Sequence, residues 1–260
     1  MSGAALVTGG AKRLGAAMAR YLAGRGYAVA VHYNSSSDAA DELVAELQAQ
    51  GARAVAVQAD LLSEAETETL VDRAVAGLET PLTCLVNNAS IFEYDTLDSA
   101  TRESWDRHIG SNLRAPYLLT QAFARQAPEA ETDENGEPRA RANIINMIDQ
   151  RVLKLTPEFS TYTLAKAGLW TLTQTAAQGL APHIRVNAIG PGPTMIGARQ
   201  SDAHFEKQRQ STVLQRGSSP AGIVAALGYL LDADGVTGQL ICVDGGQHLG
   251  WKTPDVIGVE

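Results

Sequence analysis

The stretch AALVTGGAKRLG, residues 4–15, joins an apolar run to a glycine-rich turn and then to a helical pattern. An uninterrupted apolar run such as Ala4–Val7 is typical of a strand that is buried on both faces. The glycines that follow allow backbone N–H groups to approach a pyrophosphate at a helix N-terminus, where the helix dipole favours anions. A glycine-rich turn can also be only a tight turn, so its place between a strand and a helix is what favours a dinucleotide site.

Six further strand-like runs follow along the chain, and amphipathic helical patterns separate them. They are Ala28–His32, Ala54–Gln58, Leu82–Asn87, Ala142–Ile148, Arg185–Ile189 and Leu240–Val243. This alternation predicts βαβ units, and therefore a doubly wound α/β fold with a parallel sheet covered on both faces. We expect residues 1–260 to form one domain, because the chain is long enough for a single core of this class.

Local signals refine this pattern at four places. The second helix has a stripe of apolar residues from Ala39 to Leu47, and Gly51 ends the helix. Ser63-Glu64-Ala65-Glu66 predicts a capping box at the start of the third helix. Residues Pro128–Arg141 are polar and rich in turn formers, which predicts a solvated loop. From about 193 to 219, after GPGPTM, the periodicity weakens; this segment is either a movable cover over a substrate site or an ordinary pair of surface helices.

Composition narrows the class of partner. The formal net charge of −8 argues against nucleic acid or an anionic membrane as the main partner. The sequence that follows Met1 has neither the basic region nor the apolar length of a signal peptide or membrane span. Cys84 and Cys242 both lie in strand-like runs and are expected to be buried, reduced thiols. We therefore expect a cytoplasmic protein.

The end of the second strand bears on which nicotinamide cofactor fits. An acidic residue there would bind a ribose 2′-hydroxyl and repel a 2′-phosphate. The run from Tyr33 to Ser36 is neutral, and Asp38 falls beyond it. Together with Lys12 and Arg13, these neutral donors favour NADP(H), although Ser35 and Ser36 could equally be helix caps. We expect Asp60-Leu61 and the Asn87–Ser90 turn, which follow the third and fourth strands, to lie at the same ligand-binding edge.

Several motifs occur together in an order that resembles the short-chain dehydrogenase/reductase family. They are Thr8–Gly15, Asn87–Ala89, Asn112, Tyr162 with Lys166, Pro191-Gly192 and Val243–Gly246. The resemblance spans nearly the whole chain and implies a Rossmann-type domain with a seven-stranded parallel sheet, and usually a homotetramer.

The resemblance also implies catalytic roles. Tyr162 would give a proton while the nicotinamide delivers hydride, and Lys166, one helical turn on, would lower the phenol pKa and hold the nicotinamide ribose. Asn112 would hold a water molecule in the proton relay. Without the other motifs, a Tyr and a Lys four apart would more simply be a surface pair.

One position departs from the family pattern. Most members have a serine that donates a hydrogen bond to the substrate oxygen, where this chain has Asp149. An ionised carboxylate would repel a developing oxyanion and raise the Tyr162 pKa. Asp149 is therefore either protonated in a dry pocket, part of a degenerate site, or matched to a substrate with N–H groups or a basic ring nitrogen.

The aspartate, the arginine in TGGAKRLG and the Phe after NNAS resemble the pteridine reductase and dihydromonapterin reductase branch of the family. That resemblance places Arg13 against a cofactor phosphate and the pterin, Ser90 at the substrate, and Phe92 stacked on the pterin ring. The chain departs from the branch at Ser35, where the pteridine reductases have an arginine for the 2′-phosphate. Phe92 could also be a loop-packing residue.

The expected site residues form three overlapping sets. The catalytic set is Asp149, Tyr162, Lys166 and Asn112, and the substrate set is Arg13, Ser90, Phe92, Asp149 and Tyr162. The cofactor set is Gly9, Arg13, Leu14, Gly15, Tyr33, Asn34, Ser35, Ser36, Asp60, Leu61, Asn87, Ala89, Ser90, Tyr162, Lys166, Pro191, Gly192 and Thr194. No metal is expected.

The function that these sets favour is NADPH-dependent reduction of a C=N bond in a pterin-like heteroaromatic substrate. A carbonyl or 3-oxoacyl reductase with a protonated Asp149 is the alternative among enzymes. An NADP-binding regulatory protein with an inactive site is the alternative outside them, and the complete set of Tyr162, Lys166 and Asn112 argues against it.

Overall fold

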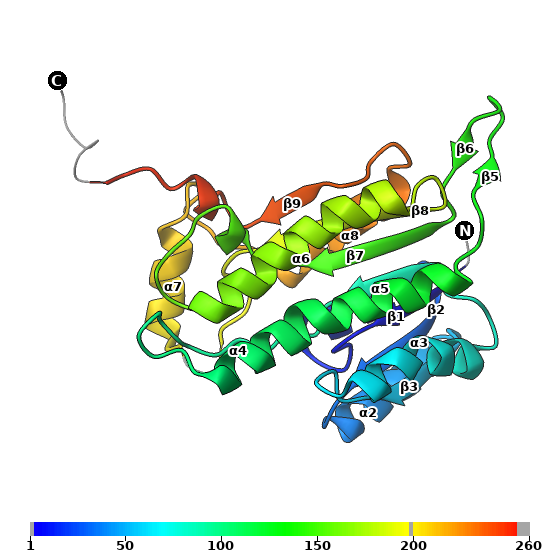
Figure 1. Ribbon diagram of the computed structural model, residues 1–260, viewed down its shortest axis with the longest axis horizontal. Helices are drawn as coiled ribbons and strands as arrows, with labels where there is room; N and C mark the ends of the chain where they lie inside the picture. Colours follow the sequence, from blue (N-terminus) through cyan, green and yellow to red (C-terminus); the bar gives the residue numbers. More distant parts are fainter. Residues whose placement is uncertain (1–2, 198–199, 254–260) are drawn as a thin grey trace.

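The computed structural model describes residues 3–197 and 200–253, which include a seven-stranded parallel sheet (Figure 1). The strands are β1 (Ala4–Val7), β2 (Ala28–Tyr33), β3 (Ala54–Gln58), β4 (Cys84–Asn87), β7 (Ala142–Met147), β8 (Ile184–Pro191) and β9 (Leu240–Val243). Their order in the sheet is β3-β2-β1-β4-β7-β8-β9. All seven predicted strands are present, with ends that differ by at most two residues, so the Rossmann-type fold is confirmed.

Helices cover both faces of this sheet. They are α1 (Arg13–Gly24), α2 (Ser37–Ala49), α3 (Glu64–Leu78), α4 (Arg102–Ile109), α5 (Ala115–Gln126), α6 (Ser160–Gly179), α7 (Asp202–Gln210) and α8 (Pro220–Asp232). Leu22 of α1, Leu47 of α2 and Leu227 of α8 pack in one core cluster, whereas α3 and α5 pack in a second, on the other face. Within β1 the clusters alternate: Val7 belongs to the first and Leu6 to the second, as a strand buried on both faces requires.

The capping box predicted before α3 is only half present. The Ser63 side chain accepts a hydrogen bond from the Glu66 backbone N–H at 3.4 Å, as predicted. The Glu66 carboxylate, however, accepts from the Asp60 backbone N–H at 2.8 Å instead of reaching back to Ser63. Glu66 thereby ties the end of β3 to the start of α3.

The polar segment before β7 is not simply a loop, and this prediction is corrected. Residues Glu131–Thr132 (β5) and Pro138–Arg139 (β6) pair as a short antiparallel hairpin that projects from the body of the molecule (Figure 1). Ion pairs from the Glu131 carboxylate to Arg139 and Arg141 support it. The hairpin lies at the edge of the sheet opposite the carboxyl ends of the strands.

The segment at about 193–219 contains one helix, α7, within its described part, so of the two alternatives the pair of surface helices is not found there. The other alternative, a movable cover, stays a prediction. Ala198 and Arg199 of this segment lie outside the described residues. The Arg209 side chain of α7 donates to the carbonyls of Pro193 and Ser218, at 3.0 and 2.7 Å, and so holds the two ends of the segment together.

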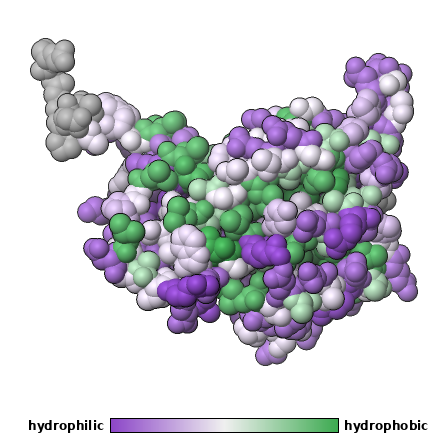
Figure 2. All heavy atoms as spheres, viewed as in Figure 1, coloured by the Kyte–Doolittle hydropathy of each residue, from purple (hydrophilic) through white to green (hydrophobic). Residues whose placement is uncertain are grey.

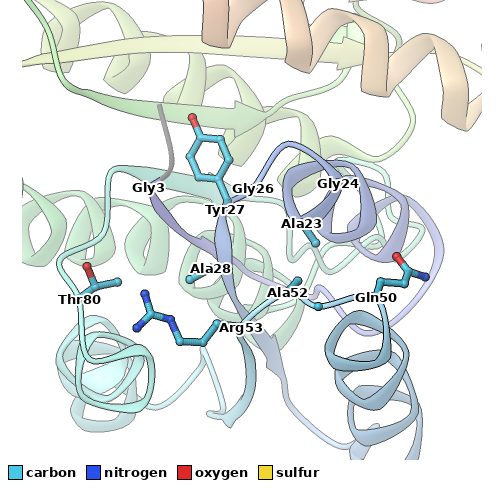
Figure 3. A pocket seen from close by; sticks show the side chains of 11 residues that line it. Gly3, Ala23, Gly24, Gly26, Tyr27, Ala28, Gln50, Ala52, Arg53 and Thr80 are labelled. Carbon is cyan, nitrogen blue, oxygen red and sulfur yellow. The ribbon is translucent and has the colours of Figure 1, made fainter.

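A cavity of about 610 Å³ lies at the amino ends of β1, β2 and β3, away from the predicted ligand edge (Figure 3). Its lining is mostly glycine, alanine and backbone, with Tyr27 and Arg53 as its larger side chains (Figure 3). Of the two free cysteines, Cys84 is buried as predicted, but Cys242 is only half-buried. Within residues 3–197 and 200–253, no helix has both the length and the apolar composition of a membrane span.

Candidate active site

The glycine-rich turn after β1 is fixed from the second strand by His32. The Gly9 backbone N–H donates to His32 Nδ1 at 3.0 Å, so the other ring nitrogen, Nε2, carries the proton and donates to the Ala59 carbonyl at 3.0 Å. Burial lowers the pKa of His32 to about 4, which keeps the ring in this neutral form. One buried ring thus joins the carboxyl ends of three strands. His32 had no predicted role, because a lone histidine in a strand does not indicate which neighbouring turns its ring will contact.

Gly9 and Gly15 leave little room for a side chain in this turn. Gly9 has a φ of +57°, and a Cβ there would lie 3.1 Å from the Ala89 Cα. A Cβ on Gly15 would lie 2.1 Å from the Gly9 carbonyl oxygen. The turn therefore packs against itself and against the Asn87–Ser90 turn, with helix α1 starting directly behind it. This is the cradle that a dinucleotide pyrophosphate requires.

The turn after β4 is held against the turn after β1 by Asn88 and Thr8. The Asn88 side chain donates to the carbonyls of Thr8 and Gly9, at 2.9 and 3.1 Å, and the Thr8 hydroxyl accepts from the backbone N–H groups of Asn88 and Ala89. Asn87 is buried and donates to Asn146 Oδ1 at 2.8 Å. Of the two asparagines, Asn88 joins the two turns, and the cofactor contact of Asn87 stays a prediction.

The other predicted cofactor positions also lie at the carboxyl ends of strands. Ser36 is the N-cap residue of α2, but its hydroxyl makes no capping hydrogen bond within the described part of the chain, and Ser35 is exposed. These hydroxyls are therefore not committed to capping. Asp38 lies in the first turn of α2, beyond the neutral run. Asp60 Oδ1 accepts from the Leu62 backbone N–H, which fixes the turn that contains Leu61.

Beyond β8, the Pro191–Thr194 turn lies beside the end of β9. The Gly192 N–H donates to the Val243 carbonyl at 3.0 Å, and the Thr194 hydroxyl donates to the Gly192 carbonyl at 2.9 Å. A Cβ on Gly192 would lie 2.6 Å from the Asp244 Cα, so this turn also requires glycine.

Asp149, Tyr162 and Lys166 come together at the end of β7. The Tyr162 hydroxyl donates to Asp149 Oδ2 at 3.0 Å, and Asp149 Oδ1 accepts from the Arg151 backbone N–H at 2.8 Å. Lys166 Nζ donates to the Met147 carbonyl at 2.8 Å and lies 5.7 Å from the centre of the Tyr162 ring. Tyr162 is 5% exposed and Lys166 2%, so the reacting groups are shielded from bulk water.

The electrostatics of this triad differ from the family expectation. Burial raises the pKa of Tyr162 well above its ordinary value, and the Asp149 carboxylate raises it further. The expected lowering of the phenol pKa by Lys166 is therefore outweighed. Burial also raises the pKa of the Asp149 carboxyl and lowers that of Lys166 to about 8. In this state Tyr162 is a protonated phenol that donates to the carboxylate.

Asn112 contacts the loop that follows β4, and Ser90 is part of this loop. Asn112, in the π-helical turn Gly110–Arg114 between α4 and α5, accepts from the Ile91 N–H at 2.9 Å and donates to the Ile91 carbonyl at 2.8 Å. Its amide thus supports the loop itself; its water-holding role stays a prediction. The Ser90 hydroxyl faces the Tyr162 phenol and counteracts part of the rise in the Tyr162 pKa.

Phe92 stands at the mouth of the site in an aromatic cluster. Its ring stacks on Phe159, with centres 4.4 Å apart and planes 13° apart, and meets Tyr162 edge-on at 4.7 Å. The Arg151 guanidinium lies 4.9 Å from the Phe159 ring centre, on the same stack. Phe92 remains 46% exposed. Phe159 had no predicted role, because its contact with Phe92 depends on the fold.

This end of the molecule also carries exposed apolar side chains. Leu153, Leu155 and Leu249 are each at least half exposed. Figure 2 shows hydrophobic residues gathered on this face, near the last described residues and the start of α6.

Comparison with known proteins places the chain in a family. Residues 3–207 match the family model described as short chain dehydrogenase. The chain belongs to the short-chain dehydrogenase family. It is therefore an oxidoreductase by family, and the resemblance noted in the sequence is confirmed.

Three relatives of this short-chain dehydrogenase differ in their described activity. The crystal structure of FolM alternative dihydrofolate reductase 1 from Brucella suis, in complex with NADP, is 41% identical, with a TM-score of 0.90; the match covers 97% of this chain and 98% of that one. Pteridine reductase 1 from Leishmania tarentolae is 33% identical, over 94% of this chain and 96% of its own. The 3-oxoacyl-[acyl-carrier-protein] reductase FabG from Staphylococcus epidermidis is 31% identical, over 96% and 100%.

Arg13 of this short-chain dehydrogenase occupies the position expected from the sequence but has different contacts. It has a left-handed backbone with φ 54°, and its guanidinium donates to the carbonyls of Ile196 and Met195 at 2.9 and 3.3 Å. Both are neutral acceptors on the segment after β8, and the side chain is exposed. Arg13 thus joins the glycine-rich turn to that segment, and remains within reach of an anion bound at the turn.

The short-chain dehydrogenase has one group of potential metal ligands among its described residues: Cys242, Asp244 and His248, whose ligand atoms lie within 4.8 Å of one another. Asp244 Oδ2 accepts from the His248 backbone N–H at 2.8 Å and pairs with His248 Nδ1 at 2.7 Å, while Oδ1 accepts from the Gly246 N–H. These hydrogen bonds form the turn that follows β9, and they explain why Asp244 and His248 lie close together.

Proposed function

We propose that this protein is an NADPH-dependent reductase of a C=N bond in a dihydropterin-like substrate. The observation that carries the proposal is the hydrogen bond from Tyr162 to Asp149, directly beside the exposed ring of Phe92. A carboxylate at this position accepts hydrogen bonds from ring N–H and amino groups, whereas it would repel the oxyanion of a reduced ketone.

NADPH would bind along the carboxyl ends of the strands, and it would supply the hydride. The glycine-rich turn fits the pyrophosphate, because Gly9 and Gly15 leave backbone in place of side chains at the start of α1. No acidic residue lies between Tyr33 and Ser36, and the Ser36 hydroxyl is available for a 2′-phosphate. The exposed charges of Lys12 and Arg13 lie on the turn itself and favour the additional anion.

The protein's own groups would deliver the proton. Tyr162 and Asp149 share a hydrogen bond, and the pKa of each is raised, so together they hold a proton in a shielded site. That proton would pass to the ring nitrogen as the neighbouring carbon is reduced. Lys166, whose ammonium lies close to both groups, would stabilise the negative charge left on the pair and position the nicotinamide ribose.

Phe92, Ser90 and Arg13 would hold the ring. A flat heteroaromatic ring gains most from stacking on an aromatic face, and Phe92 offers an exposed one next to the proton donor. The names of the Brucella and Leishmania relatives agree with a folate or pterin substrate. A homotetramer is proposed from the family resemblance alone. A cytoplasmic protein with neither nucleic acid nor membrane as its main partner is proposed from the net charge of −8 and the two free cysteines.

A second candidate function is reduction of a simple carbonyl or a 3-oxoacyl group. The observation in its favour is the raised pKa of Asp149, because a protonated carboxyl could donate a hydrogen bond to a carbonyl oxygen. The FabG relative agrees with it.

One assay separates the two candidates. NADPH oxidation is followed with 7,8-dihydropterins, dihydrofolate, small ketones and a 3-oxoacyl thioester in parallel. We expect turnover of the dihydropterins with the highest kcat/KM. Turnover of the carbonyl compounds without the dihydropterins would overturn the first proposal in favour of the second.

A further inference from the structure

The helix that contains Tyr162 starts without a capping side chain of its own. Its N-cap residue, Phe159, has a left-handed backbone with φ 57° and ψ 48° and carries no hydrogen-bond acceptor on its ring. The first four N–H groups of a helix need partners from outside the helix. At α6, the N–H groups of Phe159, Ser160 and Thr161 find their partners in a single residue on a different part of the chain, Asp95.

Asp95 lies in the loop that follows β4 and accepts hydrogen bonds with both its backbone and its side chain. Its carbonyl accepts from the N–H groups of Phe159 and Ser160, at 2.7 and 3.4 Å. Its carboxylate accepts from the Thr161 N–H at 3.2 Å and from the Thr161 hydroxyl. Asp95 is 2% exposed and Thr161 3%, so these bonds do not compete with water. A carboxylate here also interacts favourably with the helix dipole.

His108 of α4 completes the network. Its Nε2 accepts from the Glu93 backbone N–H at 3.1 Å, so the proton must be on Nδ1, which donates to the Thr161 hydroxyl at 2.6 Å. That hydroxyl in turn donates to Asp95. The ring is fully buried and lies 6.0 Å from the Tyr162 ring, centre to centre. The direction of each hydrogen bond along this chain is therefore defined, from the His108 ring through the Thr161 hydroxyl to the Asp95 carboxylate.

The network links the two groups that the proposed reaction must align. Glu93 and Asp95 are on the loop that contains Phe92, and Thr161 directly precedes Tyr162. We propose that Asp95, Thr161 and His108 are positioning residues that hold the stacking ring of Phe92 in register with the proton donor Tyr162. The inference rests on the proposed function for the role of Phe92. The network itself does not touch substrate.

The sharpest test compares two substitutions at one position. Thr161→Val keeps the shape but removes the hydroxyl, whereas Thr161→Ser keeps the hydroxyl. If the network positions Phe92 and Tyr162, Thr161→Val lowers kcat/KM for a dihydropterin about 10- to 100-fold, the scale of a small misplacement of reacting groups, while the Kd for NADPH stays unchanged. Thr161→Ser retains the wild-type kcat/KM. Equal activity of folded Thr161→Val and wild type would overturn the proposal.

A double-mutant cycle shows whether the effect passes through Phe92. Residues that act as a unit give non-additive effects on the free energy of activation. We expect Thr161→Val to lower kcat/KM by a much smaller factor in the Phe92→Leu variant than in the wild-type enzyme. Strict additivity would contradict the proposed link, since a network that served only folding stability would be indifferent to the residue at 92.

A milder variant covers the case in which Thr161→Val does not fold. Asp95→Asn preserves one acceptor but leaves the Thr161 hydroxyl proton without its carboxylate, so a smaller loss in the same direction is expected. Asp98→Asn, an exposed carboxylate on the same loop, is the matched control and keeps full activity. Equal activity of the two variants would overturn the proposal.

Hydrogen exchange provides a test that is independent of substrate. Inactivity of the wild-type enzyme with dihydropterins would overturn the proposed function but would leave the network unaffected. In that case Asp95→Asn must speed amide exchange both at 91–95 and at 159–163, relative to Asp98→Asn. Unchanged protection of either segment would overturn the network as a link between them.

Discussion

Asp149 and Tyr162 show how one side chain changes the chemistry of a shared site. The phenol donates to the carboxylate at 3.0 Å, and burial raises the pKa of both groups. A serine at 149 would instead leave a hydroxyl free to donate to a substrate oxygen. Under the proposed function, the residue at 149 therefore decides which substrate the site reduces: aspartate favours a C=N bond whose nitrogen is protonated, and serine favours a C=O bond whose oxygen becomes negatively charged.

Asp149→Ser is the direct test of that selection. We expect a loss of dihydropterin kcat of about 100-fold or more, because a positioned proton-transfer group is removed. Activity with a small ketone should rise or stay constant, since the repulsion of an oxyanion is relieved. Initial rates with both substrates at saturating NADPH measure the outcome. Unchanged dihydropterin turnover would show that Asp149 takes no part in the chemistry.

Lys166 gives the site its expected pH dependence. Burial lowers its pKa to about 8, whereas the pKa of Tyr162 lies well above 10. As the pH rises through about 8, Lys166 therefore loses its proton while Tyr162 keeps its own. The positive charge that stabilises the deprotonated Tyr162–Asp149 pair disappears, so kcat/KM should fall on the alkaline side of about pH 8. Measurement of kcat/KM from pH 6 to 10 tests for this alkaline limb, the fall above about pH 8. Arginine keeps its charge in this range, so Lys166→Arg should shift or abolish the limb.

At the scale of elements, the turns at the carboxyl ends of the strands depend on each other. Gly9 is held by His32 of β2 and packs on Ala89 after β4, while Asn88 reaches back to the carbonyls of Thr8 and Gly9. A cofactor bound at any one of these turns therefore meets a surface that several strands have fixed in advance.

Gly15→Ala tests this close packing. The new methyl group would lie 2.1 Å from the Gly9 carbonyl oxygen and 2.8 Å from Asn88 Nδ2, so the turn has to shift. We expect a cost of about 1–3 kcal/mol in unfolding free energy or in NADPH binding, as for an overpacked interior. Gly24→Ala, in the same helix, is the control: a Cβ there has no described atom within 4 Å. It should leave NADPH binding unchanged. Equal effects of the two substitutions would contradict the claim that close packing at Gly15 shapes the cofactor-binding turn.

The contacts that the sequence could not predict are those between distant elements. Apolar periodicity predicted the strands and α2, because burial of a face is a local pattern. By contrast, Glu66 caps the turn at Asp60 instead of Ser63, and Asp95 caps a helix more than sixty residues away. Arg13 has the predicted position, but its carbonyl partners lie after β8. Such partners depend on which strand ends become neighbours in the sheet.

At the scale of the whole molecule, the strand order explains why the predicted residues converge. The order β3-β2-β1-β4-β7-β8-β9 reverses direction between β1 and β4, and ligands bind at such a switch point in open α/β sheets. The turns after β1 and β4 flank it, Asp149 follows β7, and Pro191 is the last residue of β8. The sequence predicted these locations because seven buried parallel strands leave few possible topologies. It did not predict the β5–β6 hairpin, whose polar residues are held by ion pairs.

Binding of the cofactor should stabilise the whole fold, because its turns join strands across the sheet. At about 100 times its Kd, a ligand adds about 2.7 kcal/mol to the free energy of unfolding. For a chain of this size that corresponds to a rise in Tm of roughly 5–10 °C. We expect NADPH to give this rise and NADH at the same concentration to give a smaller one, because Tyr33–Ser36 has no acid for the 2′-hydroxyl.

Ser36→Asp should reverse that preference. A carboxylate at the N-cap of α2 would repel the 2′-phosphate and accept a hydrogen bond from the free 2′-hydroxyl of NADH. Thermal unfolding with each cofactor measures the change without any assumption about the substrate. The rise with NADH is the internal control, because it shows that the variant is folded and keeps its glycine-rich turn. A larger rise with NADH in the wild type would mean that these neutral residues do not select NADPH, and that the charges of Lys12 and Arg13 do not reach the 2′-position.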